Sequence, residues 1–468
     1  MSRKNEVDFT RGPLISQMII YALPIIGVNL LQILFTATDV AMLGIFTNDM
    51  AVAAVGASAN IINLLLGFLM GMSTATNVLV ARAMGAKDKE CARRYVGTSV
   101  SVSVVFGLII TVVGLLLSEK MLIWTNCDAD VLPYADKYLK IYLLGTPVIM
   151  LYNFCASILR AVGDTLRPLI FLLVSGFANI GLNAFFILVV GWDVEGVAIA
   201  TLASRVISAV CCIVIMFKND GYANLSLSKI KITKKELLGI LQIGVPIGAS
   251  KITFSFANTV IYSRLNLLGK EVMAANAISK EFEAFVLEVL HGFSIAALVI
   301  ISQNLGAKNM PRIKKTIFTS SILVGAVGVF LGAFLFFFDE ALCGIMSDTQ
   351  SVIEYAAFRV SFVGCLYVIC GFANVVQESI RGLGYSNTSL VISITANIVF
   401  RLFWILVIYP ILMVPGDLMR NYSLICMVWP LSWVITTVLG AVILYFLFKK
   451  TKNKINAEIA SEALSAAN

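Results

Sequence analysis

The sequence predicts an all-α polytopic membrane protein, with 12 transmembrane helices in two pseudo-symmetric six-helix lobes that are parallel repeats. The first observation is composition: 59% of the 468 residues are hydrophobic and only 13% are charged, whereas soluble domains carry about 25% charged residues. The second is that apolar runs of about 18 or more residues, each long enough to cross a bilayer, recur along the whole chain. The third is an internal repeat with an offset near 221 residues.

Twelve spans account for the apolar runs. They are predicted near residues 15–40, 51–78, 95–117, 138–159, 168–190, 195–217, 238–265, 272–300, 316–338, 352–378, 388–413 and 422–448. The runs are continuous and do not alternate with period two, which favours helices over strands. Because the number of spans is even, both termini lie on the same side of the membrane.

The distribution of basic residues predicts which side that is. Segments on the side of the N-terminus carry 24 Lys and Arg residues, and segments on the opposite side carry six. Since loops on the cytoplasmic side are enriched in Lys and Arg, both termini are predicted to be cytoplasmic, in a bacterial-type cell membrane. The same topology explains the net charge of +8 without nucleic acid as a partner.

Four short motifs recur in the same order in the two halves. The offset is 222 residues between Pro24 and Pro246. It is 221 between Gly85-Ala86-Lys87 and Gly306-Ala307-Lys308, and again 221 between Arg160-Ala161-Val162-Gly163 and Arg381-Gly382-Leu383-Gly384. It is 218 between Ala178-Asn179-Ile180 and Ala396-Asn397-Ile398. Two copies of six spans share one orientation, as in transporters with parallel repeats. The predicted domains are an N-terminal tail (1–14), a lobe (15–217), a cytoplasmic linker (218–236), a second lobe (237–448) and a C-terminal tail (449–468).

The first span contains one carboxylate, Asp39, within an apolar run. Polar side chains at helical spacing form one face of this span: Asn29, Gln32, Thr36 and Asp39. An acid at membrane depth costs about 2.5–3.5 kcal/mol on insertion scales, and such residues usually mark ion or substrate pathways. Asp39 is therefore predicted to couple transport to an ion. In the fifth span, Ser175, Asn179 and Asn183 also lie on one helical face.

Several segments carry a resemblance to a known family. They are Pro24, Asp39-Val40-Ala41-Met42-Leu43-Gly44, Arg82-Ala83-Met84-Gly85-Ala86-Lys87-Asp88, Arg160-Ala161-Val162-Gly163-Asp164-Thr165, Gln303-Asn304-Leu305-Gly306-Ala307-Lys308-Asn309 and Arg381-Gly382-Leu383-Gly384. In this order and in twelve spans, the chain resembles the multidrug and toxic compound extrusion (MATE) family over about residues 14–450. The resemblance implies a transporter and no enzyme: an antiporter that exports amphipathic organic cations as protons or sodium ions enter.

The resemblance also implies an ion-coupling site in the N-terminal lobe. Carried over residue by residue, Asp39 is the coupling acid, Asn179, Asn183 and Thr201 are its polar neighbours, and Asn153 is a weaker match. The family often has a second carboxylate at the position of Asn183, so the cluster in this sequence contains one acid.

A single acid favours a proton as the coupling ion. One proton neutralises one carboxylate, whereas a hard cation requires several oxygen ligands. Sodium remains an alternative at the Asp39 cluster, because the neighbouring amides and hydroxyl also carry oxygens. In the sodium-coupled norfloxacin-exporter branch, further acids would fall near Phe254 and Cys370, and this sequence has none there. No other cofactor or metal is predicted.

The C-terminal lobe has its own polar residues within spans. They are Lys251, Ser255, Asn258 and Tyr262 in span seven, Glu281, Glu288 and His291 in span eight, Arg359 in span ten, and Arg401 at the position equivalent to Asn183. Glu288 is either a second proton or cationic-substrate site or the partner of Lys251 in a structural pair, since buried pairs are weak evidence of function. Arg205, one turn beyond Thr201, could likewise hold Asp39 in a permanent ion pair.

A flippase for lipids or lipid-linked oligosaccharides is the alternative function with the same two-lobe architecture. It requires a strongly cationic central cavity, and four basic residues within spans keep it open: Lys251, Arg205, Arg359 and Arg401. A membrane-embedded enzyme has little support, because the chain has one His and no clustered nucleophile and base. The predicted partners are small organic cations and membrane lipid, and the protein is expected to be a monomer.

Overall fold

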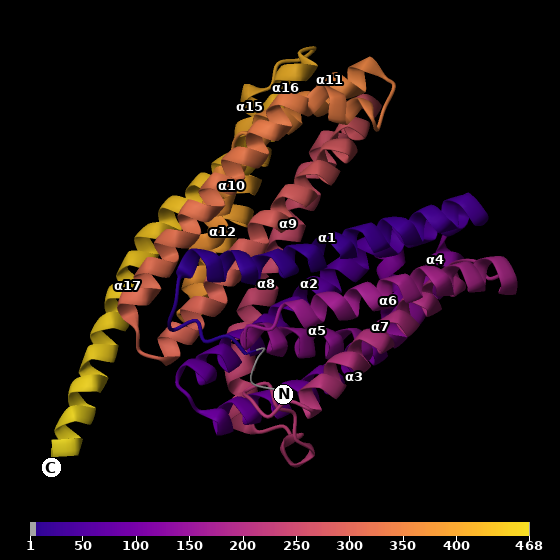
Figure 1. Ribbon diagram of the computed structural model, residues 1–468. Coiled ribbons are helices and arrows are strands. Elements are labelled where there is room, and N and C mark those ends of the chain that lie inside the picture. Colours follow the sequence, from indigo (N-terminus) through magenta and orange to yellow (C-terminus); the bar gives the residue numbers. More distant parts are fainter. Residues whose placement is uncertain (1–5, 468) are drawn as a thin grey trace. The chain divides into compact units, whose positions relative to one another are not determined.

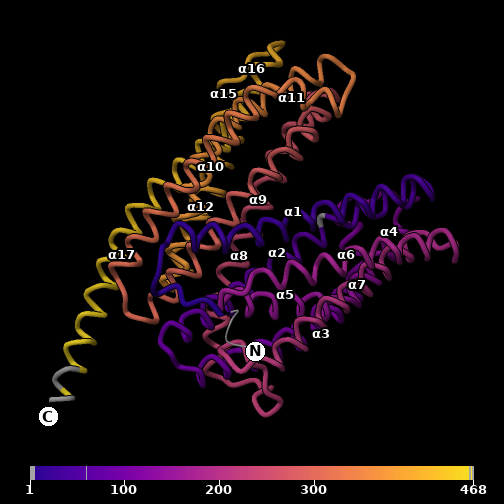
Figure 2. The backbone as a smooth tube through the Cα atoms, in the orientation of Figure 1, coloured from indigo at the N-terminus to yellow at the C-terminus, as the bar shows by residue number. Residues whose placement is uncertain are grey.

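The computed structural model describes residues 6–467, and its regular elements are helices (Figure 1, Figure 2). Residues 1–5 of the predicted N-terminal tail and residue 468 of the predicted C-terminal tail lie outside the described part. The first half contains α1 (Leu14–Phe46), α2 (Asp49–Gly85), α3 (Lys89–Trp124), α4 (Leu132–Leu144), α5 (Thr146–Ala161), α6 (Leu166–Ala184), η1 (Phe185–Val190), α7 (Val194–Phe217) and η2 (Leu227–Lys229). The second contains α8 (Lys234–Asn266), α9 (Lys270–Gly306), α10 (Met310–Gly344), α11 (Gln350–Gly364), α12 (Tyr367–Gly382), α13 (Ser386–Ser393), η3 (Ile394–Phe400), α14 (Arg401–Phe403), η4 (Trp404–Ile408), α15 (Tyr409–Leu412), α16 (Leu418–Cys426) and α17 (Val428–Ala467).

The helices give the predicted twelve spans. Within the described residues, ten helices are long and apolar enough to cross a membrane, and two bent pairs, α4 with α5 (48°) and α11 with α12 (49°), each supply one more. The all-helical prediction with twelve spans in two lobes is confirmed. The bends interrupt predicted spans four and ten. Pro147 at the start of α5 accounts for the first break, because proline cannot donate the helical hydrogen bond.

The internal repeat extends to backbone conformation. Lys87 and Lys308 both adopt left-handed backbone angles (φ 58° and 55°), and so do Gly163 and Gly384 (φ 93° and 92°). Both pairs keep the 221-residue offset of the sequence motifs. A left-handed angle is unusual for lysine, so its occurrence at equivalent turns is independent evidence that the halves are structural copies.

Two compact units form the described chain. Residues 6–8 and Leu23–Gly248 form the first, here called the N-unit, and Phe9–Ala22 with residues 249–467 form the second, the C-unit. This division differs from the predicted lobes 15–217 and 237–448, because the start of α1 belongs to the C-unit and the start of α8 to the N-unit.

Local contacts explain this exchange of helix starts. In the C-unit, the amide of Phe9 donates to Gln303 Oε1 at 3.0 Å. In the N-unit, Arg94 Nε donates to Glu236 Oε1 at 2.9 Å. Helices α1 and α8 have 33 residues each, or about 50 Å at 1.5 Å per residue, so their first turns extend beyond one bilayer thickness and pack on other helices.

Small residues allow close packing at equivalent places in both units. A Cβ on Gly107 of α3 would lie 2.5 Å from the Cα of Pro147 in α5, and one on Gly328 of α10 would lie 2.9 Å from the Cα of Val368 in α12. Figure 1 shows α3 beside α5 in the N-unit and α10 beside α12 in the C-unit. Close approach through glycine is typical of membrane helices.

The predicted C-terminal tail continues the last span. Helix α17 extends to Ala467 without a break, and Lys308 contacts it through an ion pair with Glu462 (Nζ to Oε1, 2.7 Å). The predicted end of span twelve near residue 448 is therefore the end of the apolar part, while the helix itself extends further.

Candidate functional site: a polar cluster in the N-unit and a charged cavity in the C-unit

A close helix contact brings Asp39 to its polar neighbours. In the N-unit, Gly176 of α6 faces Phe35 of α1, and a Cβ at this position would lie 1.9 Å from the phenylalanine ring. The missing side chain lets α1 approach α6. Asp39 lies one helical turn after Phe35 and thereby reaches the buried polar face of α6.

Asp39 accepts two side-chain hydrogen bonds. Asn183 Nδ2 donates to its Oδ1 at 2.6 Å, and Thr201 Oγ1 of α7 donates to its Oδ2 at 3.3 Å. Asn179 connects the two donors, because its Nδ2 donates to Thr201 Oγ1 and its Oδ1 accepts from Asn183 Nδ2, both at 3.4 Å. The structure thus brings together all four residues that were predicted to form the coupling cluster.

The cluster is buried on the α6 side. The exposed fraction is 0% for Asn183 and 4% for Asn179, and Asp39 is half-buried. Asn183 Oδ1 has no hydrogen-bond partner within residues 6–467, although it is buried. A buried polar atom without a partner costs about 1–3 kcal/mol. Beside a carboxylate, such an oxygen is suited to accept a hydrogen bond from the protonated acid or to ligate a cation.

Two other predicted residues lie apart from these bonds. Asn153 Nδ2 donates to the Ile149 carbonyl of its own helix at 2.9 Å. The guanidinium of Arg205 lies 5.9 Å from the centre of the Tyr152 ring, and it forms no ion pair with Asp39 within 4.0 Å in the described structure. The neighbours of the Asp39 carboxylate are therefore neutral donors.

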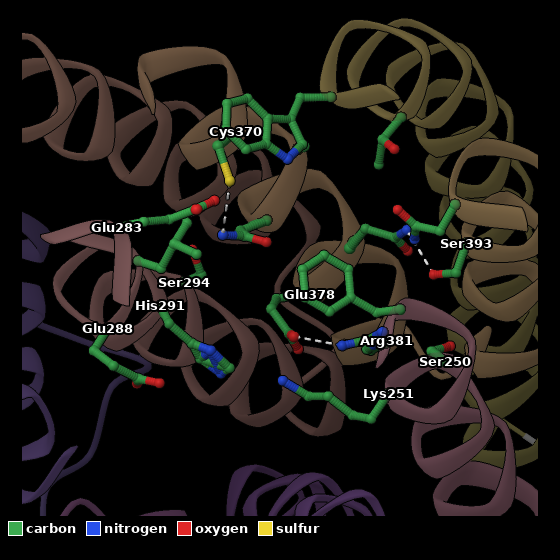
Figure 3. A pocket seen from close by; sticks show the side chains of 18 of the residues that line it. Ser250, Lys251, Glu283, Glu288, His291, Ser294, Cys370, Glu378, Arg381 and Ser393 are labelled. Atoms are coloured by element: carbon green, nitrogen blue, oxygen red, sulfur yellow. Dashed lines mark hydrogen bonds and ion pairs between the residues drawn. The ribbon is translucent and has the colours of Figure 1, made fainter. Parts of the chain in front are cut away.

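Part of the second predicted polar set lines a cavity of about 240 Å³ in the C-unit, whereas Ser255, Asn258, Tyr262, Glu281 and Arg359 are not in its wall. Figure 3 shows Lys251, Glu288 and His291 in this cavity, together with the ion pair between Glu378 and Arg381. Phe254, Cys370 and Arg401 also form its wall. The positions at which the sodium-coupled branch would have acids therefore lie on the cavity, but they present a ring and a thiol.

Arg401 is the most deeply buried charge of this wall, with 0% exposure. Its Nη1 donates to Asn258 Oδ1 at 2.8 Å and its Nε donates to Ser432 Oγ at 3.0 Å. The Phe254 ring centre lies 5.1 Å from its guanidinium carbon. The residue begins α14, between the π-helical segments η3 and η4, and π-helical turns are frequent at functional sites.

Sequence reasoning missed two buried ion pairs of the C-unit. Glu283 Oε2 lies 2.6 Å from Arg359 Nη2, and Glu378 Oε1 lies 2.6 Å from Arg381 Nη1. Arg359 also donates to Asn276 and lies over the Trp429 ring, 4.3 Å from its centre.

The sequence predicts a polar face of span eight that contains Glu281, but the buried polar face of this helix contains other residues. Glu281, part of the predicted face, is exposed, whereas Asn276, Ser279 and Glu283 are buried at helical spacing. The spacing of these three residues is a signal that the sequence did contain. For the second pair, the i, i+3 spacing of Glu378 and Arg381 was available as well.

Comparison with known proteins identifies the family. The MatE family profile matches residues 24–185 and 246–406, once in each half. The chain belongs to the MATE family. Its relatives include a probable multidrug resistance protein NorM from Thermotoga maritima, which is 26% identical over 398 residues (83% of this chain and 84% of that protein). They also include the multidrug export protein MepA from Staphylococcus aureus strain NCTC 8325, 24% identical over 386 residues (80% and 84%).

Solved MATE structures have the same fold. A MATE structure in the bent conformation aligns with a TM-score of 0.88 at 20% identity and covers 96% of this chain and 100% of that chain. A MOP superfamily transporter from Pyrococcus furiosus, for which reverse polarity of the binding pocket suggests a different function, aligns with a TM-score of 0.87 at 20% identity, over 96% of this chain and 99% of that one. This MATE chain is accordingly a multi-pass membrane protein with the family fold.

Proposed function

We propose that this MATE protein is a cation-coupled multidrug efflux antiporter that exports amphipathic organic cations by alternating access. The names of its relatives, multidrug resistance and multidrug export proteins, support the efflux class. The coupling ion in this proposal is a proton in preference to sodium.

The observation that carries the proposal is the Asp39 carboxylate with neutral donors around it. Two side chains donate to it, at 2.6 Å and 3.3 Å, and no basic side chain pairs with it within 4.0 Å in the described structure. A carboxylate at membrane depth that lacks a permanent counterion can exchange its proton as its exposure changes. One acid supports one proton, while the unpaired Asn183 Oδ1 is the feature that would favour sodium.

One proton provides enough free energy for export. Moving one charge through the membrane potential provides about 2.3 kcal/mol per 100 mV, and each pH unit adds about 1.4 kcal/mol. Since about 1.4 kcal/mol corresponds to a tenfold ratio, the potential alone supports a gradient of some tens-fold for a neutral substrate. For electroneutral exchange against a monovalent cation, the pH gradient alone remains.

The proposed orientation places both termini in the cytoplasm of a bacterial-type cell membrane, with the protein acting as a monomer. The excess of Lys and Arg on one side of the spans supports this orientation. The flippase alternative gains no support from the C-unit cavity, because three acids (Glu283, Glu288 and Glu378) line it beside its basic residues and the cavity is not strongly cationic.

A proteoliposome assay with a fluorescent cationic dye tests the proposal. A proton gradient and a sodium gradient are imposed separately on the wild type and on Asp39→Asn, with membrane insertion of the variant checked in parallel. We expect proton-driven dye transport by the wild type and none by Asp39→Asn. Transport driven only by sodium would overturn the proton assignment. Indifference of the wild type to both gradients would overturn antiport.

A further inference from the structure

The guanidinium of Arg401 has one nitrogen left for a ligand. Asn258 and Ser432 occupy Nη1 and Nε at 2.8 Å and 3.0 Å, and Nη2 has no hydrogen-bond partner within the described residues although it is buried. Asn258 is itself fixed, since Trp429 Nε1 also donates to its Oδ1 at 3.1 Å. These bonds fix the orientation of the guanidinium while leaving one N–H unpaired, at a cost of about 1–3 kcal/mol for a buried donor.

Two of the acids that line the cavity form ion pairs with arginines other than Arg401. Glu283 pairs with Arg359 and Glu378 pairs with Arg381, each at 2.6 Å. Neither Arg401 nor Lys251, the second base at this cavity without an ion pair, lies within 4.0 Å of a described carboxylate oxygen. The cavity wall therefore contains a fully buried positive charge whose hydrogen-bond partners are neutral side chains.

The size of the cavity fits a ligand group rather than a single water. Its volume of about 240 Å³ exceeds the roughly 10–15 Å³ that one water requires on this measure. It is slightly below the volume of about 300–1,000 Å³ typical of sites that enclose a whole drug-sized molecule. Such a cavity can receive the polar end of an amphipathic molecule.

We propose that the C-unit cavity is an oxyanion site, in which Arg401 Nη2 binds the carboxylate of an amphipathic organic acid or zwitterion. A guanidinium is suited to a carboxylate because it is permanently charged and planar, and charge-assisted bonds of this kind are the strong ones. The inference names the residue and the cavity that would bind a carboxylate in the proposed exporter, and it rests on that function only for transport.

Equilibrium binding of two matched dyes tests the site without any gradient. The full-length protein in phosphatidylcholine nanodiscs is titrated with rhodamine B, which has a free carboxylate, and with its ethyl ester, and fluorescence anisotropy is followed. We expect Arg401→Gln to weaken binding of the free acid by about tenfold to a hundredfold, the effect of losing about 1.5–3 kcal/mol from a hydrogen bond to a charged group. Binding of the ester should change less than about threefold. Arg420→Gln, which removes an exposed arginine of α16, should leave both affinities unchanged.

A competition experiment on the wild type keeps the test independent of how the variant folds. Benzoate should displace rhodamine B, and benzamide, which has nearly the same shape without the charge, should not. Equal displacement of rhodamine B by benzoate and benzamide would overturn the oxyanion site. So would equal weakening of rhodamine B and ester binding in Arg401→Gln, and Arg401 would then be a packing residue. Because no gradient is applied, these results are separate from failure of the proposed antiport.

A lipid phosphate has the same oxyanion chemistry, and nanodisc composition distinguishes it. The binding of rhodamine B is measured again with phosphatidylglycerol added to the phosphatidylcholine. We expect the Arg401-dependent affinity to persist. A loss of affinity in the wild type but not in Arg401→Gln would show that a lipid headgroup occupies the site, and would overturn the assignment to small amphiphiles.

Discussion

The two halves of this MATE protein place a neutral amide and a charged guanidinium at equivalent positions. Asn183 and Arg401 are related by the same 218-residue offset as the Ala-Asn-Ile motifs, and each is followed within three residues by a π-helical segment, η1 or η4. In the N-unit the amide donates to an acid, Asp39. In the C-unit the arginine donates to an amide, Asn258 of α8.

The difference shows how a duplicated fold can hold charge inside a membrane in two ways. Asp39 and Arg401 form hydrogen bonds with neutral side chains and no ion pair within the described residues, which leaves a place for an ion or a charged ligand. Glu283 and Arg359 are satisfied by each other at 2.6 Å, which leaves none. A buried charge with neutral partners is therefore the better functional candidate, and a closed pair is the better structural one.

The largest expected effect is a difference in the free energy of unfolding between variants of two acids, Glu283 of the ion pair and Asp39 of the proposed coupling site. Glu283→Gln leaves Arg359 as an uncompensated buried charge, and breaking a buried pair in this way lowers the free energy of unfolding by about 3–5 kcal/mol. Asp39→Asn should lower it by less than about 1 kcal/mol, since its partners are neutral. Denaturant titration of the purified protein measures both values.

A double variant is the control for this prediction. Glu283→Gln combined with Arg359→Gln should recover most of the lost stability, because no charge is then left unpaired. If Glu283→Gln alone destabilises the protein no more than Asp39→Asn does, the distinction between charges held in an ion pair and charges held by neutral partners is wrong.

Placing the arginine of the C-unit at the equivalent position of the N-unit should abolish coupling. In Asn183→Arg, a guanidinium replaces an amide that lies 2.6 Å from Asp39 Oδ1. A close buried ion pair is worth about 1.5–7 kcal/mol, so gradient-driven dye transport should fall by at least about tenfold at 1.4 kcal/mol per tenfold. Transport in proteoliposomes is the measurement.

Asn183→Gln is the matched control, because it keeps the amide and adds no charge. It should retain more transport than Asn183→Arg at equal membrane insertion. Full coupled transport by the arginine variant would falsify the view that Asp39 must be free of a permanent counterion.

The repeat explains why so much of the fold was predictable from sequence. The motifs at the 221-residue offset correspond to turns with matching left-handed angles at Lys87 and Lys308. The Asp39 cluster was also predictable, because Asn179 and Asn183 lie on one helical face and the family resemblance supplied Thr201. The exchange of helix starts at Ala22 and Gly248 was not, because it depends on contacts between residues far apart in sequence: Phe9 and Gln303 are 294 positions apart, and Arg94 and Glu236 are 142 apart.

The pairing of charges in the C-unit was less predictable for a physical reason. Helix α9 carries acids at Glu271, Glu281, Glu283 and Glu288, and helical periodicity alone admits more than one polar face. The face that is buried depends on where Arg359 of α11 lies, and that position follows from tertiary packing.

A smaller effect is expected from the second donor to Asp39. Thr201→Val removes the hydroxyl that donates to Oδ2 at 3.3 Å while keeping the shape of the side chain. A hydrogen bond to a charged group contributes about 1.5–3 kcal/mol, and the long distance places this one at the lower end, about tenfold. The proton concentration that gives half-maximal transport should shift by about that factor. Thr201→Ser, which keeps the hydroxyl, should stay near the wild type, and equal shifts in both variants would contradict the role of the hydroxyl.

The smallest expected effect concerns the two equivalent turns at which the halves have the same backbone conformation. Lys87 and Lys308 share a left-handed angle, which disfavours any side chain by roughly 1–2 kcal/mol relative to glycine. Lys87 is exposed, so Lys87→Gly should raise the free energy of unfolding by up to about 1 kcal/mol once the extra flexibility of unfolded glycine is subtracted. Lys308→Gly should raise it less, because it also loses the ion pair with Glu462 at 2.7 Å, and a partly exposed pair contributes about 0.2–1 kcal/mol.

Alanine variants at the same two turns separate strain from charge. Lys87→Ala keeps the Cβ and its strain, so it should remain near the wild type in the same denaturant titration, while Lys308→Ala should lose only the ion pairs with Glu462 and Glu458. If glycine and alanine at Lys87 give equal stability, the left-handed turn stores no strain and the conformational match between the halves has no energetic consequence. The free energy of unfolding should differ between Lys87→Gly and Lys308→Gly by the same amount as between Lys87→Ala and Lys308→Ala. In that case the two turns carry the same backbone strain, and only the ion pairs of Lys308 distinguish them.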